Sequence, residues 1–190
     1  DRVDVSHFRL SIHLIIAFLI LSFILWNYLR LNIVNNIVNN TNFVIIFIFL
    51  ILIFCQITIG AFVSGMDAGK IYNSWPLMGS SYFPDDNSLI NLFNLSVFSE
   101  PSLVQFIHRN LAYLIFIFYL IILLRIYKKN FINLYFSVNL LGVLLLIQIV
   151  LGIFTLLYGA QIFLASMHQI SSIFLVSSSV YLLYLNTNSN

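Results

Sequence analysis

The chain has 190 residues, of which 61% are hydrophobic and only 7% are charged, and its formal net charge at pH 7 is +2. A soluble domain carries about 25% charged residues, so this composition excludes a soluble domain and indicates a protein with several membrane-spanning segments. The net charge is too small to indicate nucleic-acid binding. The chain has one cysteine, so an internal disulfide is excluded.

Five apolar runs follow one another along the chain, and each is long enough for a membrane-spanning helix, which takes about 20 residues. We expect these helices at residues 8–29, 43–63, 103–126, 134–158 and 162–185. The predicted fold class is all-α, a polytopic bundle of five transmembrane helices. The short gap before the last run predicts a tight antiparallel hairpin. The long connection, residues 64–102, holds all three prolines, and we expect it to form a surface loop over one end of the bundle.

Basic residues indicate how the bundle lies in a membrane, because lysine and arginine gather on the cytoplasmic side. Four of them lie at the end of the bundle away from the long connection: Arg30, Arg125, Lys128 and Lys129. We therefore expect that end to face the cytoplasm or the mitochondrial matrix. The long loop is then expected on the periplasmic or intermembrane side of a bacterial plasma membrane or a mitochondrial inner membrane.

Three of the four histidines lie near the starts of helices that run in the same direction: His13, His108 and His168. At about 1.5 Å per residue, each lies roughly 7–10 Å below the same surface. Ionisable residues inside a membrane mark functional sites by default, although a histidine at the headgroup level, bound to a loop, is the alternative. Two imidazoles that face each other at one depth are the ligands that a six-coordinate haem iron requires. The sequence therefore indicates a bound haem.

The surroundings of these histidines are compatible with a porphyrin. Its propionates would point toward the long loop, where Arg109, Lys70 or Arg9 could pair with them. Small residues such as Gly60 and Gly152 leave room for a flat ring, although ordinary close packing of helices explains them equally well. The chain has no Cys-x-x-Cys-His motif, so a covalently attached haem is not expected.

A faint internal repeat accompanies two of the histidines. The second and fourth runs share the pattern Gln-Ile-x-x-Gly-x-Phe, at residues 56–62 and 148–154, and each is followed by a helix with a histidine near its start. Chance similarity between apolar runs is the alternative, and the residues alone do not decide between the two. As a repeat, the pattern predicts two similar hairpins packed face to face.

Several longer motifs resemble the haem A synthase family. They are VSHFRLSIHL at 5–14, GAFVSGMDAGKIYNSWPLMG at 60–79, FPDD at 83–86, EPSLVQFIHR at 100–109 and LASMHQ at 164–169, in the family's order. That family has eight helices in two four-helix bundles, and the five runs here resemble its fourth to eighth. The resemblance implies that residues 1–42 hold one helix of an earlier bundle, and that residues 43–190 form a four-helix, haem-binding bundle. We expect the earlier half in the same longer chain or in a separate one.

The resemblance implies an oxidoreductase that oxidises a ring methyl of haem O to a formyl group, giving haem A for terminal oxidase assembly. It implies a b-type haem cofactor between His108 and His168, and His13 as one ligand of the substrate haem O. Arg109 is expected to contribute to cofactor binding. Ile107 departs from the family's pattern, in which a polar or acidic residue precedes the ligand histidine. The second substrate ligand and the loop glutamate of the family lie outside this chain, so we expect no catalytic residue here and no activity from the chain alone.

Two other functions stay open. A non-enzymatic, bis-histidine b-type membrane cytochrome fits the histidines equally well, although the loop motifs favour the enzyme. An assembly or interaction protein with structural histidines would bind no porphyrin. The expected partners are haem O, membrane lipid and the missing helices in cis or in trans, with a further copy of the chain as an open alternative and no nucleic acid.

Overall fold

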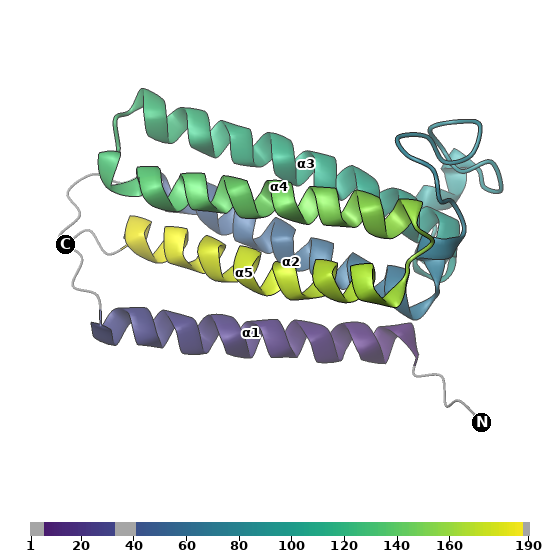
Figure 1. Ribbon diagram of the computed structural model, residues 1–190, viewed down its shortest axis with the longest axis horizontal. Helices are drawn as coiled ribbons and strands as arrows, with labels where there is room; N and C mark the ends of the chain where they lie inside the picture. Colours follow the sequence, from purple (N-terminus) through teal and green to yellow (C-terminus); the bar gives the residue numbers. More distant parts are fainter. Residues whose placement is uncertain (1–5, 33–40, 188–190) are drawn as a thin grey trace.

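The computed structural model describes residues 6–32 and 41–187 as an assembly of helices and connecting loops (Figure 1). Its long helices are α1 (His7–Asn32), α2 (Phe43–Gly65), α3 (Pro101–Lys128), α4 (Tyr135–Leu157) and α5 (Ile162–Thr187). Within the described residues, five helices are long and apolar enough to cross a membrane. The predicted all-α fold with five such helices is confirmed, and every boundary agrees to within 3 residues.

Local sequence explains where several helices begin and end. The Asn42 side chain accepts a hydrogen bond from the Val44 backbone nitrogen at 2.9 Å and so caps the start of α2. Pro101 is the first residue of α3, a position that needs no backbone N–H donor. Between α4 and α5, Gly159 and Ala160 adopt φ values of +67° and +55°, which reverse the chain. The predicted tight hairpin between these helices is therefore confirmed.

Helices α2, α3, α4 and α5 pack in a ring in which each contacts two neighbours. The α2–α3 and α4–α5 pairs are antiparallel and closely packed, and contacts of α3 with α4 and of α2 with α5 close the ring (Figure 1). Helices α3 and α5 consequently lie diagonally across the ring from each other. Helix α1 packs outside the ring, against α2 and α5. The connection between α1 and α2, residues 33–40, lies outside the described residues.

The larger buried cluster fills the half of the ring away from the long loop, and a smaller one, of Ile59, Phe62 and Val104, lies between α2 and α3 near the loop. Within the half away from the loop, each of the four helices contributes residues with at most 1% of their surface exposed, among them Phe49, Ile122, Leu141 and Val176. Both α4 and α5 are fully described, and α4 has no buried residue after Leu145 while α5 has none before Ser172. Helices α4 and α5 are therefore less buried near the long loop than at the opposite end.

The long connection occupies residues 66–100 and lies at the end of the bundle where α3 and α5 begin, next to the start of α3 (Figure 1). It contains three short 3₁₀ helices, namely η1 (Ala68–Lys70), η2 (Leu89–Phe93) and η3 (Leu95–Ser99). A further 3₁₀ turn, η4 (Ile132–Leu134), leads into α4 at the opposite end. The loop therefore lies at the end of the bundle where α4 and α5 are less buried.

Candidate functional site

His108 is the eighth residue of α3, and its side chain lies against α2. The Gln56 side-chain Nε2 donates to the His108 backbone oxygen at 3.0 Å and lies 3.3 Å from the ring Nε2. One turn further along α2, a Cβ atom at Gly60 would lie 3.0 Å from the ring Cε1. The ring is thus held between Gln56 and Gly60, and its Nδ1 is buried with no hydrogen-bond partner among the described residues.

His168 is the seventh residue of α5 and has an equivalent environment on α4. The Gln148 side-chain Nε2 donates to the His168 backbone oxygen at 3.0 Å and lies 3.3 Å from the ring Nδ1 and 3.4 Å from the ring Nε2. A Cβ atom at Gly152 would lie 3.0 Å from the ring Cε1. In addition, the Ser171 hydroxyl is hydrogen-bonded to Gln148 Oε1 and lies 2.9 Å from the His168 backbone oxygen.

These two environments come from the two copies of the sequence repeat, residues 56–62 and 148–154. The repeat corresponds to a repeated contact, because in each hairpin the first residue holds a histidine of the next helix and the fifth leaves space for its ring. The sequence pointed to the glycines as spacers but missed the role of the glutamines. Their shared place at the start of both copies was the signal that could have identified them.

His108 and His168 have matching surroundings, each on its own hairpin. They come from α3 and α5, which are diagonal partners in the ring, and they occupy nearly equivalent positions in those helices. Both lie in the half of the bundle that the buried core leaves less filled. The structure therefore places His108 and His168 at nearly matching heights on diagonal helices, in the half of the bundle beside the long loop.

His13 is the seventh residue of α1, and the structure does not bring it to the other two histidines. Its side chain is exposed, whereas Ser11 lies on the packed face of α1 and donates to the Thr58 backbone oxygen at 3.3 Å. Among the described residues, no hydrogen bond or ring contact joins His13 to His108 or His168. His13 is thus available to a group outside the described part of the chain.

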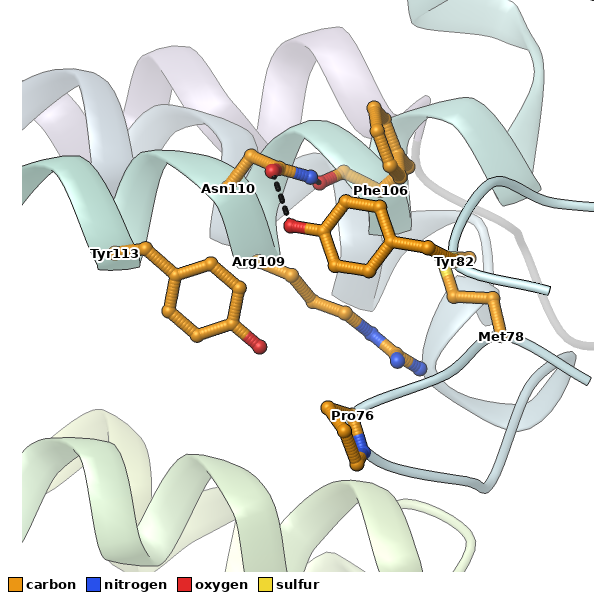
Figure 2. Close-up of a pocket in the computed structure, with 7 residues that line it drawn as sticks. All are labelled: Pro76, Met78, Tyr82, Phe106, Arg109, Asn110 and Tyr113. Atoms are coloured by element: carbon orange, nitrogen blue, oxygen red, sulfur yellow. Dashed lines mark hydrogen bonds between the residues drawn. The ribbon is translucent and has the colours of Figure 1, made fainter.

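Arg109 follows His108 and extends toward the long loop (Figure 2). Its Nη1 donates to the backbone oxygens of Ser74 at 2.9 Å and Leu77 at 3.2 Å, and its Nη2 donates to that of Tyr72 at 2.9 Å. These acceptors are neutral, and within the described residues no carboxylate forms an ion pair with the guanidinium. Arg109 therefore fixes the path of the loop while its positive charge stays uncompensated.

Further hydrogen bonds attach the loop to the bundle, and the second of these is drawn in Figure 2. They join Trp75 Nε1 to Tyr113 Oη at 2.8 Å, Tyr82 Oη to Asn110 Oδ1 at 2.6 Å, and Asn73 Nδ2 to the Leu156 backbone oxygen at 2.9 Å. The first two contacts reach α3 and the third reaches the end of α4. The loop is therefore anchored on two sides of the histidine-containing half.

Within the loop, Asp85 organises a turn by accepting hydrogen bonds from two serine hydroxyls. Ser81 Oγ lies 2.8 Å from Asp85 Oδ1, and Ser80 Oγ lies 2.9 Å from Asp85 Oδ2. These hydrogen bonds stabilise the ionised carboxylate and lower the pKa of Asp85 from its ordinary value, with the Ser81 bond as the largest cause. The turn therefore depends on the charged form of Asp85.

Comparison with known proteins adds to this geometry. Residues 1–180 match the family described as cytochrome oxidase assembly protein. The chain is 44% identical to a heme A synthase of Pelagibacter ubique over 99% of this chain and 55% of that protein. It is 39% identical to a heme A synthase of Ehrlichia ruminantium, over 97% of this chain and 52% of that protein. It is 36% identical to a heme A synthase of Rickettsia prowazekii, over 98% of this chain and 56% of that protein. The chain thus spans about half the length of the curated relatives it matches. No solved structure gives a significant match.

Proposed function

The chain belongs to the cytochrome oxidase assembly protein family, and from that premise we propose that it forms the cofactor-haem half of a haem A synthase. The complete protein would oxidise a ring methyl of haem O to a formyl group and so give haem A for terminal oxidase assembly. The observation that carries the proposal is the pair His108 and His168, which two equivalent hairpins hold at nearly matching heights on diagonal helices.

The residues at this pair fit a haem. A porphyrin supplies four nitrogen ligands to its iron, so the two imidazoles would complete six-coordination. Among the described residues, no group of three or more histidine, cysteine, aspartate or glutamate side chains could hold a bare metal ion, whereas two imidazoles suffice for an iron already in a porphyrin. The unpartnered, buried Nδ1 of His108 also supports a missing ligand or partner, because buried polar atoms are nearly always satisfied.

In this proposal, His108 and His168 hold a b-type haem, which supplies one-electron transfer when bound. The chain contributes binding, orientation and exclusion of water. The long loop covers the site from the aqueous side and is anchored on α3 and α4. Arg109 brings an uncompensated positive charge to the same end of the bundle, which favours the anionic propionates of a porphyrin.

We further propose that His13 is one ligand of the substrate haem O. Its exposure on α1, away from the cofactor pair, supports a second site completed by groups outside the described residues. Those groups would come from the earlier half found in the relatives, in cis or in trans. No catalytic residue is assigned within this chain, and the chain alone is expected to be inactive in haem O oxidation.

We place the long loop on the periplasmic side of a bacterial plasma membrane or on the intermembrane side of a mitochondrial inner membrane. Arg125 and Lys128 lie in the last turn of α3, at the opposite end, which supports a cytoplasmic or matrix location for that end. At the loop end, Lys70 is paired with Asp67 at 2.8 Å. Its charge is thereby balanced locally.

The cofactor assignment is tested by adding haem b to the purified chain in detergent and recording the reduced-minus-oxidised absorption spectrum. We expect a sharp b-type band in the unmodified chain and its loss in His108→Ala and His168→Ala. His13→Ala is the matched control and should retain the band, because His13 lies outside the pair. Absence of the band in the unmodified chain, or equal binding by all four proteins, would refute the assignment.

The second candidate is a b-type cytochrome that transfers electrons without oxidising haem O. It is favoured by the fact that this chain contains the whole cofactor pair, whereas His13 has no histidine partner among the described residues. Co-expression with the earlier helices of a relative, in cells that make haem O, separates the two. Extraction of a formyl porphyrin supports the synthase, and extraction of haem O and haem b alone supports the cytochrome.

A further inference from the structure

We propose that Gln56 and Gln148 are positioning residues for the two imidazoles, and that they set the orientation of each ring at the iron site. This inference rests on the proposed function, in which His108 and His168 hold a haem. Neither glutamine is suggested to touch the iron or the porphyrin. Each acts through the histidine of the neighbouring antiparallel helix.

Both glutamines lie in the interior of strongly apolar segments. The spans that contain α2 and α4 have mean hydropathies of 2.9 and 2.8. A side-chain amide in such a segment is costly unless it is hydrogen-bonded, because lipid offers no partner. Gln56 and Gln148 find the same partner, the backbone oxygen of the facing histidine, at 3.0 Å in each case. That bond uses no ring nitrogen, so it can persist whichever ring nitrogen binds iron.

The contact restricts the ring as well as the backbone. Gln56 and Gly60 are one helical turn apart, as are Gln148 and Gly152, and each imidazole lies against both members of its pair. The amide lies 3.3 Å from a ring nitrogen, and the ring Cε1 lies only 3.0 Å from where a Cβ atom would stand on the glycine. Rotation of the ring about its Cβ–Cγ bond would bring it against one of these two surfaces. The pair therefore selects one ring plane at each ligand.

The two hairpins differ in the contacts of the glutamine oxygen, which makes the ligands inequivalent. Ser171, three residues after His168, is hydrogen-bonded to Gln148 Oε1, so that amide is fixed at both its oxygen and its nitrogen. Leu111 occupies the corresponding place after His108, and Gln56 Oε1 is buried without a partner among the described residues. We therefore expect the His168 ring to be the more firmly oriented of the two.

The test compares Gln56→Leu and Gln148→Leu with the unmodified chain after addition of haem b. Haem affinity is measured by absorption titration, ring orientation by the electron paramagnetic resonance g-values of the low-spin ferric haem, and electronic tuning by the midpoint potential. Loss of an outer partner of a metal ligand typically lowers affinity by about 10- to 100-fold. We expect a loss of that size in both variants, with shifted g-values and a shifted midpoint potential.

The matched control is Gln161→Leu, since Gln161 is an exposed glutamine outside the helices. The haem affinity and the spectra of this variant should equal those of the unmodified chain. Gln56→Glu and Gln148→Glu keep the side-chain shape but lose the amide N–H groups, and they decide the question should a leucine variant fail to fold. Unchanged affinity, g-values and potential in the folded variants would overturn this inference and leave the haem proposal intact. Absence of haem from the unmodified chain would overturn both.

Discussion

Replacing Gly142 by alanine tests the close approach of α3 and α4 in the filled half of the bundle. A Cβ atom at residue 142 would lie 2.0 Å from Tyr119 Oη and 2.6 Å from Tyr119 Cζ. Tyr119 is only 6% exposed, and its hydroxyl donates to the Val138 backbone oxygen at 3.3 Å. The rigid phenol ring cannot avoid the new methyl group without moving as a whole, so the tyrosine or the helices must shift.

The expected loss of stability follows from three contributions. Forcing an extra methyl group into a packed core costs about 1–3 kcal/mol, and loss of the Tyr119 hydrogen bond costs about 1 kcal/mol. Alanine in place of a helical glycine returns about 1 kcal/mol. We therefore expect the free energy of unfolding to fall by about 1–3 kcal/mol in Gly142→Ala.

The assay is equilibrium unfolding in mixed detergent micelles, followed by far-ultraviolet circular dichroism. Tyr119→Leu and the double variant Tyr119→Leu/Gly142→Ala complete a double-mutant cycle. Because leucine removes the atoms that clash, alanine at residue 142 should cost little or nothing in the Tyr119→Leu background. A Gly142→Ala protein as stable as the unmodified chain, or an equal loss in both backgrounds, would refute the reasoning.

Three further predictions concern the site and its loop. Gly152→Ala and Gly60→Ala each place a methyl group 3.0 Å from a histidine Cε1. We therefore expect weaker haem binding in an absorption titration, with little change in helicity. Unchanged haem binding would contradict the role of these glycines in leaving space for the histidine rings. Arg109→Met removes three hydrogen bonds to the loop. Because one bond to a charged group contributes about 1.5–3 kcal/mol, the amides of residues 72–75 and 77 should exchange hydrogen at least about tenfold faster, and equal exchange would refute the role of Arg109 in holding the loop. The pKa of Asp85 lies below its ordinary value of 3.8, so its stabilisation of the loop is present above about that pH and is lost as the pH falls through the lowered pKa. Proteolysis of the loop should therefore accelerate in strong acid, and Asp85→Asn should remove this dependence; an unchanged acid profile in that variant would exclude the carboxylate as its source.

The helices could be predicted from the sequence because the membrane imposes length and composition on each span. The five apolar runs and the short gap before residue 162 were sufficient for the number of helices and for the last hairpin. The nearly equal positions of His108 and His168 in their helices likewise followed from counting residues from each helix start. These features depend on spacing along the chain, which a single sequence records directly.

Features that depend on rotation and tertiary contact could not be predicted in the same way. Apolar residues surround each helix on all sides, so no hydrophobic face indicates which way Gln56 or Gln148 points. Nor does periodicity describe the path of an irregular loop, and the carbonyl partners of Arg109 therefore emerged only in the structure. The exposure of His13 depends on how α1 packs against α2 and α5, and not on its own sequence.

The uneven filling of the ring has a consequence for how a large planar molecule could enter. Local opening costs least where few apolar contacts must be broken, which here means the halves of α4 and α5 beside the loop. The far end, closed around Phe49 and Val176, keeps the four helices in register while the near end separates. For the haem proposed above, loading would therefore require only partial splaying, so assembly of the protein and insertion of the haem could be successive events.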